Sequence, residues 1–574
     1  MESSTILITI ILITTSTNFI NIVSAKAKVT VKDEIVIFND CYSPDLRNIK
    51  DFHTNPGSVQ ISHCYLPELP NALFQNLPKL KTLEICESKL SHIQDYALNG
   101  LTELETLVLS RNNISVLKSW SNTDMESLHH LDLRRNSIKE LTENALKRYP
   151  NLTKLNLAVN QISTIDDMSF IHTPHLKYLN LGKNLLTTVT KETFRGLHKL
   201  THLSLHYNQI DYLDFYSFVG NSHLKSLQLQ GNKIAVFESD YVANLPRLSF
   251  LNISGNVIET IGENSFKKSV EMRVLDLSHN LIQELPETTF SGLEVLEYLN
   301  ISHNRIETLS KYVFEDFLEL RFLDMASNNL TQLPDNVFEY VSHLTTLNLS
   351  HNQISEIGDT TFEHLKQLEV LDLAFNNLNH DSFLWVFEQL PFLNLSANQF
   401  NEINVTLLNM LCKSVQLYDN PWDCVFLVKE LASHSHNAIL HFGTNYTIKS
   451  KDAILEVPGL ECIDSKTGKI RSIVLLDSKD NEDFISQQNS DPESVQTKQS
   501  KATIIDVGDG FDFKSILLWL CIGVFVVFGA LLLLRNLLKR SERKSEEWRT
   551  QHQAELLNTI DDTEKAAKPS DENA

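Results

Sequence analysis

The chain has 574 residues, of which 42% are hydrophobic and 21% charged, and Gly and Pro are too sparse for a collagen-like or low-complexity protein. The formal net charge is -22, and -20 of it falls on residues 26–514. Such an acidic segment is a poor partner for nucleic acid, because that binding depends on neutralising phosphates. We therefore expect no nucleic-acid partner.

The chain opens on a short apolar stretch from Ile6 to Ile13 that ends at Val23-Ser24-Ala25. This small-residue spacing is typical of a signal-peptidase site, and we expect a signal peptide over residues 1–25. The amino-terminal end of the stretch lacks Lys and Arg, which leaves a membrane anchor as the alternative. The apolar core is, however, too short to span a bilayer.

Three cysteines follow in the amino-terminal flank, Cys41, Cys64 and Cys86. Disulfides are the normal state of cysteines in a secreted segment. We prefer the pair Cys41–Cys64, with Cys41–Cys86 left open.

A repeat of 24 residues then dominates the chain. Twelve units, from LETLVLSRNNI at 104–114 to LEVLDLAFNNL at 368–378, follow one another without insertion or deletion. LKTLEICESKL at 80–90 precedes them, and LPFLNLSANQF at 390–400 follows after 22 residues. A period of this length indicates a stacked solenoid.

Within each unit, the two apolar residues of LxL point one way and the middle residue the other, as a strand requires. The Asn of each unit, such as Asn136, Asn160 and Asn184, is expected inside the turn, where it bonds backbone groups of its own and neighbouring coils. A second ladder is expected to pack in the core, with Val242 filling its one gap: Phe170, Phe194, Phe218, Phe266, Phe290, Phe314, Phe338 and Phe362.

These units resemble the leucine-rich repeat, LxxLxLxxNxL, of the 24-residue extracellular class, over about residues 56–424. The whole pattern is similar to insect-type single-pass transmembrane leucine-rich-repeat proteins, which include adhesion and immune proteins. The resemblance implies an α/β-type repeat solenoid, a horseshoe with a parallel concave sheet and cysteine-containing caps.

The carboxy-terminal flank, Asn420-Pro421-Trp422-Asp423-Cys424, resembles the NPWDC opening of the cap of secreted repeat proteins. The resemblance implies a disulfide between Cys424 and Cys462. The usual CxC is absent, so only one bridge is expected. Cys412 aligns with the first Leu of a last repeat and is expected to be a buried thiol.

The concave sheet is the expected binding surface, because it varies from coil to coil and solenoids bind there. Aromatic side chains are enriched at interaction hot spots. The outward aromatic positions include Phe250, Tyr298, Phe322 and Phe375. The candidate ligand-binding residues are His130, Arg134, Tyr178, His202, His206, Tyr207 and Gln228.

Nine Asn-x-Ser/Thr sequons are candidate glycosylation sites: Asn113, Asn151, Asn252, Asn300, Asn329, Asn348, Asn394, Asn404 and Asn445. Four of them, Asn252, Asn300, Asn348 and Asn394, fall at the middle strand position. Glycans there would coat the carboxy-terminal half of the concavity and leave the amino-terminal half open to a partner.

Beyond the repeats, residues 515–534 carry no charge and match the thickness of a bilayer core as a helix. Basic residues from Arg535 to Lys544 follow, and such residues stay cytoplasmic. We therefore expect a type I plasma-membrane protein with its amino terminus outside. The expected segments are a signal peptide at 1–25, an N-terminal cap with a first weak repeat at 26–79, repeats at 80–411, a C-terminal cap at 412–464, a flexible acidic stalk at 465–514, a transmembrane helix at 515–534 and a cytoplasmic tail at 535–574.

No nucleophile with a paired base, phosphate loop or metal-ligand cluster is recognisable, so we expect no enzyme activity, cofactor or metal. The expected function is that of a cell-surface receptor or co-receptor for an extracellular protein ligand or surface partner, with innate immune recognition among the candidate roles. Cell–cell adhesion is the alternative, and homodimer formation stays open. The basic start of the tail is expected to contact membrane lipid.

Overall fold

A computed structural model describes residues 28–32, 35–42, 56–71 and 73–426, followed by five short strands between 439 and 505. The chain separates into two units, 1–504 and 505–574, and the solenoid belongs to the first. The expected signal peptide, transmembrane segment and tail lie outside the described residues, as does most of the expected stalk. Among the described residues, no helix has both the length and the apolarity that crossing a membrane requires.

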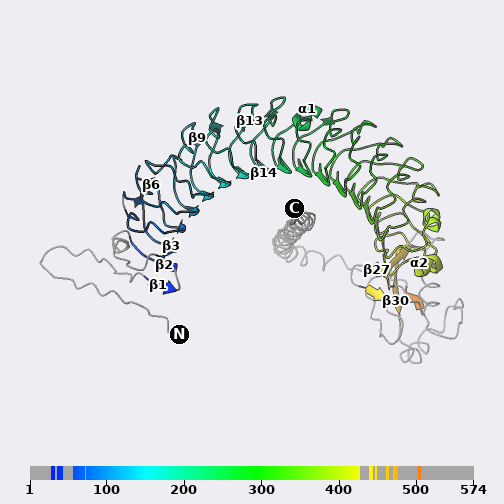
Figure 1. The fold of residues 1–574 in the computed structure, drawn as a ribbon. Coiled ribbons are helices and arrows are strands. Elements are labelled where there is room, and N and C mark those ends of the chain that lie inside the picture. Colours follow the sequence, from blue (N-terminus) through cyan, green and yellow to red (C-terminus); the bar gives the residue numbers. More distant parts are fainter. Residues whose placement is uncertain are drawn as a thin grey trace, which may run out of the picture. The chain divides into compact units, whose positions relative to one another are not determined.

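Each repeat forms one coil, and the coils stack so that their strands line the inner side of an arc (Figure 1). Neighbouring strands pair in parallel at an offset of one repeat, for example Leu155 with Leu179 and Leu179 with Leu203. The strands in spatial order are β2 (Ile35–Asn39), β3 (Ser58–Ser62), β5 (Thr82–Cys86), β7 (Thr106–Val108), β8 (His130–Asp132), β10 (Lys154–Asn156), β12 (Tyr178–Asn180), β14 (His202–Ser204), β16 (Ser226–Gln228), β18 (Phe250–Asn252), β20 (Val274–Asp276), β21 (Tyr298–Asn300), β22 (Phe322–Asp324), β23 (Thr346–Asn348), β24 (Val370–Asp372), β25 (Phe392–Asn394), β26 (Ser414–Gln416) and β27 (Ile439–Gly443).

Antiparallel strands close both ends of this sheet, β1 (Lys28–Lys32) against β2 and β28 (Tyr446–Ile448) against β27. A separate three-stranded sheet follows, made of β29 (Leu460–Ile463), β30 (Ile470–Leu475) and β31 (Ala502–Ile505). The expected parallel concave sheet is thus confirmed.

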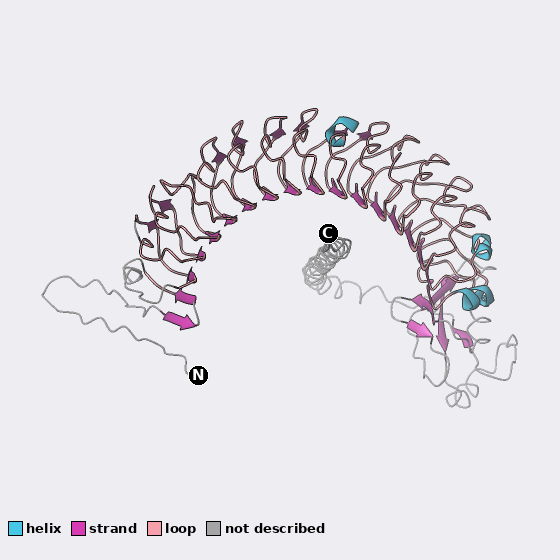
Figure 2. Ribbon diagram, viewed as in Figure 1, coloured by secondary structure: helices cyan, strands magenta, loops and turns pink. Residues whose placement is uncertain are grey.

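The outer side of the arc carries turns, short strands and short helices (Figure 2). Among the described residues, four pairs of two-residue strands form there: β4 (Glu68–Leu69) with β6 (His92–Ile93), β9 (Glu140–Leu141) with β11 (Thr164–Ile165), β13 (Thr188–Val189) with β15 (Tyr212–Leu213), and β17 (Val236–Phe237) with β19 (Thr260–Ile261). The helices are α1 (Ser239–Val242), the 3-10 helix η2 (Ser382–Val386) and α2 (Val405–Leu411).

The asparagine ladder holds consecutive coils together. Asn160 shows the pattern: its Nδ2 donates to the carbonyls of Leu133 at 3.1 Å and Leu157 at 2.9 Å, and its Oδ1 accepts from the Ile138 backbone N–H at 3.0 Å. Each unpaired buried group would cost about 1–3 kcal/mol, so loss of this asparagine from a coil is strongly destabilising. The expected ladder is confirmed.

The residue before each ladder asparagine has a left-handed backbone, from Arg111 (φ 57°) to Asp419 (φ 58°). This conformation turns the chain out of the strand and aims the backbone N–H at the next coil, as when Arg135 N–H donates to the Ala158 carbonyl at 2.9 Å. Gly231 and Gly255 occupy this position in two consecutive coils.

Leucines and the phenylalanine stripe fill the core between the two sides. Phe170, Phe194 and Phe218 lie in successive coils with ring centroids 6.2 and 6.0 Å apart, all buried. Val242 is buried in the gap, where Phe237 stacks on Phe266 at 5.5 Å. The stripe is packing, as expected.

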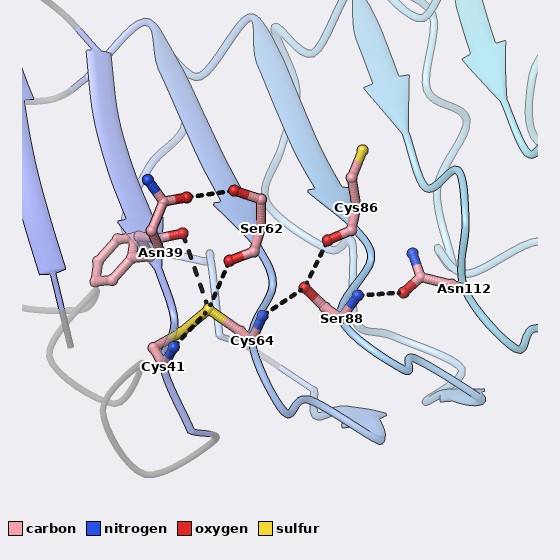
Figure 3. The surroundings of a disulfide bond; sticks show 8 residues. Asn39, Cys41, Ser62, Cys64, Cys86, Ser88 and Asn112 are labelled. Atoms are coloured by element: carbon pink, nitrogen blue, oxygen red, sulfur yellow. Dashed lines mark hydrogen bonds between the residues drawn. A yellow bond between two sulfur atoms is a disulfide. The ribbon is translucent and has the colours of Figure 1, made fainter. Parts of the chain in front are cut away.

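The amino-terminal cap contains the preferred disulfide, Cys41–Cys64, which joins the ends of β2 and β3 (Figure 3). The alternative with Cys86 is wrong, because Cys86 is a free, half-buried thiol. Ser88 takes the ladder position in this coil: its hydroxyl donates to the Cys86 carbonyl at 2.8 Å and its N–H donates to Asn112 Oδ1 at 3.0 Å.

At the other end, Cys424 is disulfide-bonded. The side chain of Cys462, its expected partner, lies outside the described residues. The backbone N–H of the adjacent Ile463 donates to the Trp422 carbonyl at 2.8 Å, which brings the two segments together. Cys412 is a buried free thiol that follows α2, as expected.

Candidate binding surface

The concave face consists of four rows of side chains, one residue per coil in each. Row 1 contains the first residue of each strand, and row 2 contains the third. Row 3 contains the residue two positions after the row 2 residue. Row 4 contains the next residue, which has the left-handed backbone and precedes the ladder asparagine. In the coil of β8 these are His130, Asp132, Arg134 and Arg135. The sheet register aligns row 1 from His130 to Lys154, Tyr178 and His202.

An aromatic platform lies in row 1 of the amino-terminal half. The Tyr178 ring stacks on the His202 ring with centroids 4.5 Å apart. The Lys154 ammonium lies over the Tyr178 ring, 5.1 Å from its centroid. This contact leaves the ammonium exposed while fixing the ring in place.

Two glycines hold two further rings of the candidate set. A Cβ on Gly182 would lie 2.1 Å from His206 Cε1, so the imidazole of His206 rests on this glycine. A Cβ on Gly231 would lie 2.4 Å from a ring carbon of Tyr207, which rests in the same way. His206 and Tyr207 meet edge to face at 5.5 Å, and the Lys183 ammonium lies 5.2 Å from the Tyr207 centroid.

His130 and His206 are neutral at physiological pH, because burial lowers the pKa of each. Burial lowers the pKa of His206, and the nearby Lys183 lowers it further. Burial also lowers the pKa of His130, with Lys154 and Arg134 adding to this effect and Asp132 opposing it. Positive charge in this region therefore comes from lysine and arginine.

The remaining candidates complete this half of the surface. Arg134 Nε lies 3.2 Å from Asp132 Oδ2 and is otherwise exposed. Gln228 is half-buried, and its Oε1 accepts from Ser204 Oγ at 3.0 Å. All seven candidate residues thus lie on the concave face of five consecutive coils.

Comparison with known protein families matches the leucine rich repeat family over residues 58–114, 102–162, 150–210, 213–258, 270–330, 323–378 and 342–400, together more than half of the chain. The chain belongs to the leucine-rich repeat family. Among curated proteins, none matches it significantly.

The chain is similar to several solved structures, and two of them, with TM-scores above 0.5, share its fold. The Drosophila Toll–Spatzle complex contains a chain that is 19% identical, with a TM-score of 0.55, covering 80% of this chain and 74% of that one. In the glycosylated form of that complex, the identity is 20% and the TM-score is 0.55, and the match covers 75% of this chain and 58% of that one. The plant peptide hormone receptor RGFR1 in complex with RGF2 is 20% identical, with a TM-score of 0.48, and the match covers 69% of this chain and 66% of that one. The TLR13–ssRNA13 complex is 20% identical, with a TM-score of 0.34, and the match covers 67% of this chain and 73% of that one.

The carboxy-terminal half of the repeat surface has a different chemistry. Row 2 alternates strictly between amide and acid through Asn252, Asp276, Asn300, Asp324, Asn348, Asp372 and Asn394. Between Ser226 and Ala397, all of them described, the four rows contain no Lys or Arg. Burial raises the pKa of Asp372, which accepts from Asn394 Nδ2 at 3.1 Å.

The row 2 sequons are engaged in this ladder. The side chains of Asn252, Asn300 and Asn394 are only 5%, 4% and 7% exposed. Asn252 Oδ1 accepts from the N–H of Ser254 at 3.0 Å, and its Nδ2 donates to Asp276 Oδ2 at 3.2 Å. These positions belong to the concave face, but the amides of Asn252, Asn300 and Asn394 are covered by neighbouring side chains, while Asn348 is half-buried.

Other sequons are open. Asn113, Asn329 and Asn404 are exposed, and Asn404 also accepts from Leu407 N–H as the N-cap of α2. Asn151 is half-buried, and Asn445 lies outside the described residues. Phe250, expected to face outward, is 3% exposed, with its register partners Ser226 and Val274 buried beside it.

Sequence reasoning missed four exposed cations in these rows, Arg111, Arg135, Lys154 and Lys183. Their repeat positions, row 4 for Arg111, Arg135 and Lys183 and row 1 for Lys154, would have revealed them, because residues at those positions belong to the concave face. Among the described residues, no group of three or more His, Cys, Asp or Glu side chains is placed to hold a metal ion.

Proposed function

We propose that this leucine-rich repeat protein is a single-pass receptor or co-receptor of the plasma membrane that binds an extracellular protein through the amino-terminal half of its concave face. The observation that carries the binding site is the set of rings held in place there, Tyr178 on His202 and Tyr207 on Gly231. Tyr178 and Tyr207 remain exposed at 37% and 50%. Large rings held in place in advance lose little entropy on binding.

The membrane topology rests on the sequence. Residues 1–25 have the pattern of a signal peptide, and residues 515–534 form an uncharged stretch followed by basic residues. The Toll–Spatzle complex, which contains a chain that shares the fold, shows a protein bound to a protein of this kind. A protein ligand for the repeat surface is consistent with this case.

An epitope tag at residue 30 tests the topology. We expect it to stain intact cells, while a tag at residue 570 stains only permeabilised cells. The reverse pattern would place the repeats inside the cell and so contradict the proposal that the protein is a cell-surface receptor.

A single substitution tests the binding face. Arg135 is exposed in row 4, and Ser137 follows two residues later, so Arg135→Asn creates a sequon. Asparagine tolerates the left-handed backbone at this position. A glycan there would cover the proposed face, and we expect capture of the partner, identified by proximity labelling on living cells, to fall at least tenfold.

Two controls accompany this variant. Arg135→Asn with Ser137→Ala makes the same substitution without a sequon. Lys191→Asn creates a sequon with Thr193 just after β13 on the outer side and should leave capture intact. If the occupied glycan at 135 leaves capture unchanged, the partner binds elsewhere.

Adhesion between cells is the second candidate, because a broad concave surface also suits a neighbouring copy. Beads coated with the full-length chain separate the two functions. Homotypic clumping supports adhesion, whereas dispersed beads that capture a different protein support the receptor.

A further inference from the structure

The concave face is electrically polarised along the arc. Arg134, Arg135, Lys154 and Lys183, here called the cationic patch, lie within three consecutive coils. The next eight coils contribute no cation to the four rows and three aspartates to row 2, Asp276, Asp324 and Asp372. This contrast stands out in a segment whose net charge is -20 over residues 26–514.

The charges of the patch are available to a ligand. Asp132 pairs with Arg134, but no ion pair among the described residues includes Arg135, Lys154 or Lys183. The ammonium groups of Lys154 and Lys183 instead lie over Tyr178 and Tyr207. A tyrosine face orients an ammonium without neutralising it, so the full charge remains for a partner.

The patch also combines charge with apolar surface. Its rings, Tyr178, His202, His206 and Tyr207, lie in the same and the next coil as its lysines. Burial lowers the pKa of His206, so this imidazole contributes flat, weakly polar surface rather than charge. A matching ligand must therefore present acidic and aromatic or apolar side chains together.

We propose that the cationic patch binds a short acidic segment of the protein partner, whose carboxylates meet Arg135, Lys154 and Lys183 and whose apolar side chains lie on the rings. This inference rests on the proposed function and specifies the chemistry of its ligand. A long sulfated glycan fits less well, because the acidic remainder of the face repels a polyanion that extends beyond the patch. At physiological salt that repulsion acts over about 8 Å, less than two coils.

A direct binding measurement tests the chemistry. The probe is a fluorescein-labelled peptide that repeats Glu-Tyr-Glu-Gly, and its counterpart repeats Gln-Tyr-Gln-Gly. Fluorescence anisotropy follows binding to the purified full-length chain in mild detergent. We expect the acidic peptide to bind at least tenfold more tightly than its counterpart, and to weaken between about 50 and about 300 mM salt.

Charge reversal locates the site. The triple variant Arg135→Glu, Lys154→Glu, Lys183→Glu should lose peptide binding by at least tenfold. Glutamate fits row 4, since Glu87 occupies it in an earlier coil with φ 50°. The matched control changes the net charge by the same amount at three exposed positions outside the rows, with the substitutions Lys191→Glu, Lys267→Glu and Lys268→Glu. It should alter peptide binding less than twofold.

The outcomes separate this inference from the proposed function. If the glycan at position 135 blocks partner capture but the triple reversal leaves peptide binding and capture intact, the face is right and the acidic ligand is wrong. If a heparin oligosaccharide binds the patch and the acidic peptide does not, the site is a glycan site. Equal binding of the two peptides also overturns the proposal.

Discussion

The imidazole of His206 lies across the Cα of Gly182 in the preceding coil, so close that a methyl group on the glycine would fall 2.1 Å from its Cε1 atom. The His206 ring can therefore occupy its position on the binding face only because residue 182 has no side chain. The Gly182 backbone is not left-handed, so space rather than backbone conformation requires glycine here.

Gly182→Ala should consequently displace His206 and disturb Tyr207 beside it. The ring is half exposed and can move, so we expect a stability loss of about 1 kcal/mol, at the low end for overpacking, together with a clear loss of partner capture. Gly220→Ala is the control, because its Cβ would meet nothing closer than 4.0 Å. Unchanged capture in a folded Gly182→Ala variant would show that His206 has no part in binding.

The asparagine ladder should dominate the stability of a coil. Asn208 donates to the carbonyls of Leu181 and Leu205 and accepts from the Leu186 N–H at 3.1 Å. Asn208→Ala leaves these buried groups unpaired, at a cost of about 2–3 kcal/mol. Urea unfolding followed by circular dichroism measures this loss, with the exposed neighbour Gln209→Ala as a control that should stay within about 0.5 kcal/mol.

The thiols should differ in reactivity. Burial raises the pKa of Cys412 to about 12, while Cys86 is only half-buried. Iodoacetamide at pH 8 should label Cys86 slowly and Cys412 only after denaturation, as read by mass spectrometry. A disulfide at Cys412 in the native protein would contradict its assignment as a core thiol.

Removal of the cap disulfide should have a larger effect than loss of this thiol. Cys424→Ser should destabilise the carboxy-terminal flank by about 2–5 kcal/mol and, if Cys462 is the partner, make Cys462 alkylatable. Cys412→Ala should leave the number of disulfides unchanged. Thermal melts and mass spectrometry of both variants distinguish the two roles.

Acidification should destabilise the amino-terminal half through its histidines. Folding lowers the pKa values of His130 and His206, so the unfolded chain binds more protons as the pH falls below about 6.5. The free energy of unfolding is therefore at its full value above this pH, where His130 and His206 are neutral in both states, and it decreases as the pH falls below it. His130→Gln with His206→Gln should flatten the melting temperature between pH 7 and 5, whereas His223→Gln, at an exposed position, should not.

Glycan occupancy should follow exposure rather than the sequon motif. We expect occupied sites at Asn113 and Asn329, and little occupancy at Asn252, Asn300 and Asn394, whose amides are buried in row 2. Glycopeptide mass spectrometry of the protein from cultured cells measures this directly. High occupancy at Asn300 would mean that row 2 opens, and that the carboxy-terminal concavity is coated.

The repeat made most of the fold predictable, because the ladder from Asn112 to Asn420 and the phenylalanine stripe recur at fixed spacing and each has one physical solution. Details of the concave face were not predictable in the same way. The outward direction of Asn252 and Phe250 followed from strand alternation, but with neighbouring strands about 4.8 Å apart both residues are covered by the side chains around them, Asn252 in row 2 and Phe250 in row 1. The contact of His206 with Gly182 joins two coils, and nothing in either repeat alone specifies it.

Because each ladder asparagine from Asn112 to Asn376 bonds its neighbours in the same geometry, a coil is an interchangeable part. Loss or duplication of one 24-residue unit would join equivalent partners again and leave the core continuous. The order of residues along the rows would change instead. A cation or an aromatic ring would then lie one coil nearer to, or one coil further from, the other side chains that contact the ligand. Unequal recombination between repeats is thus a route by which this protein could acquire a new ligand without an intermediate that fails to fold.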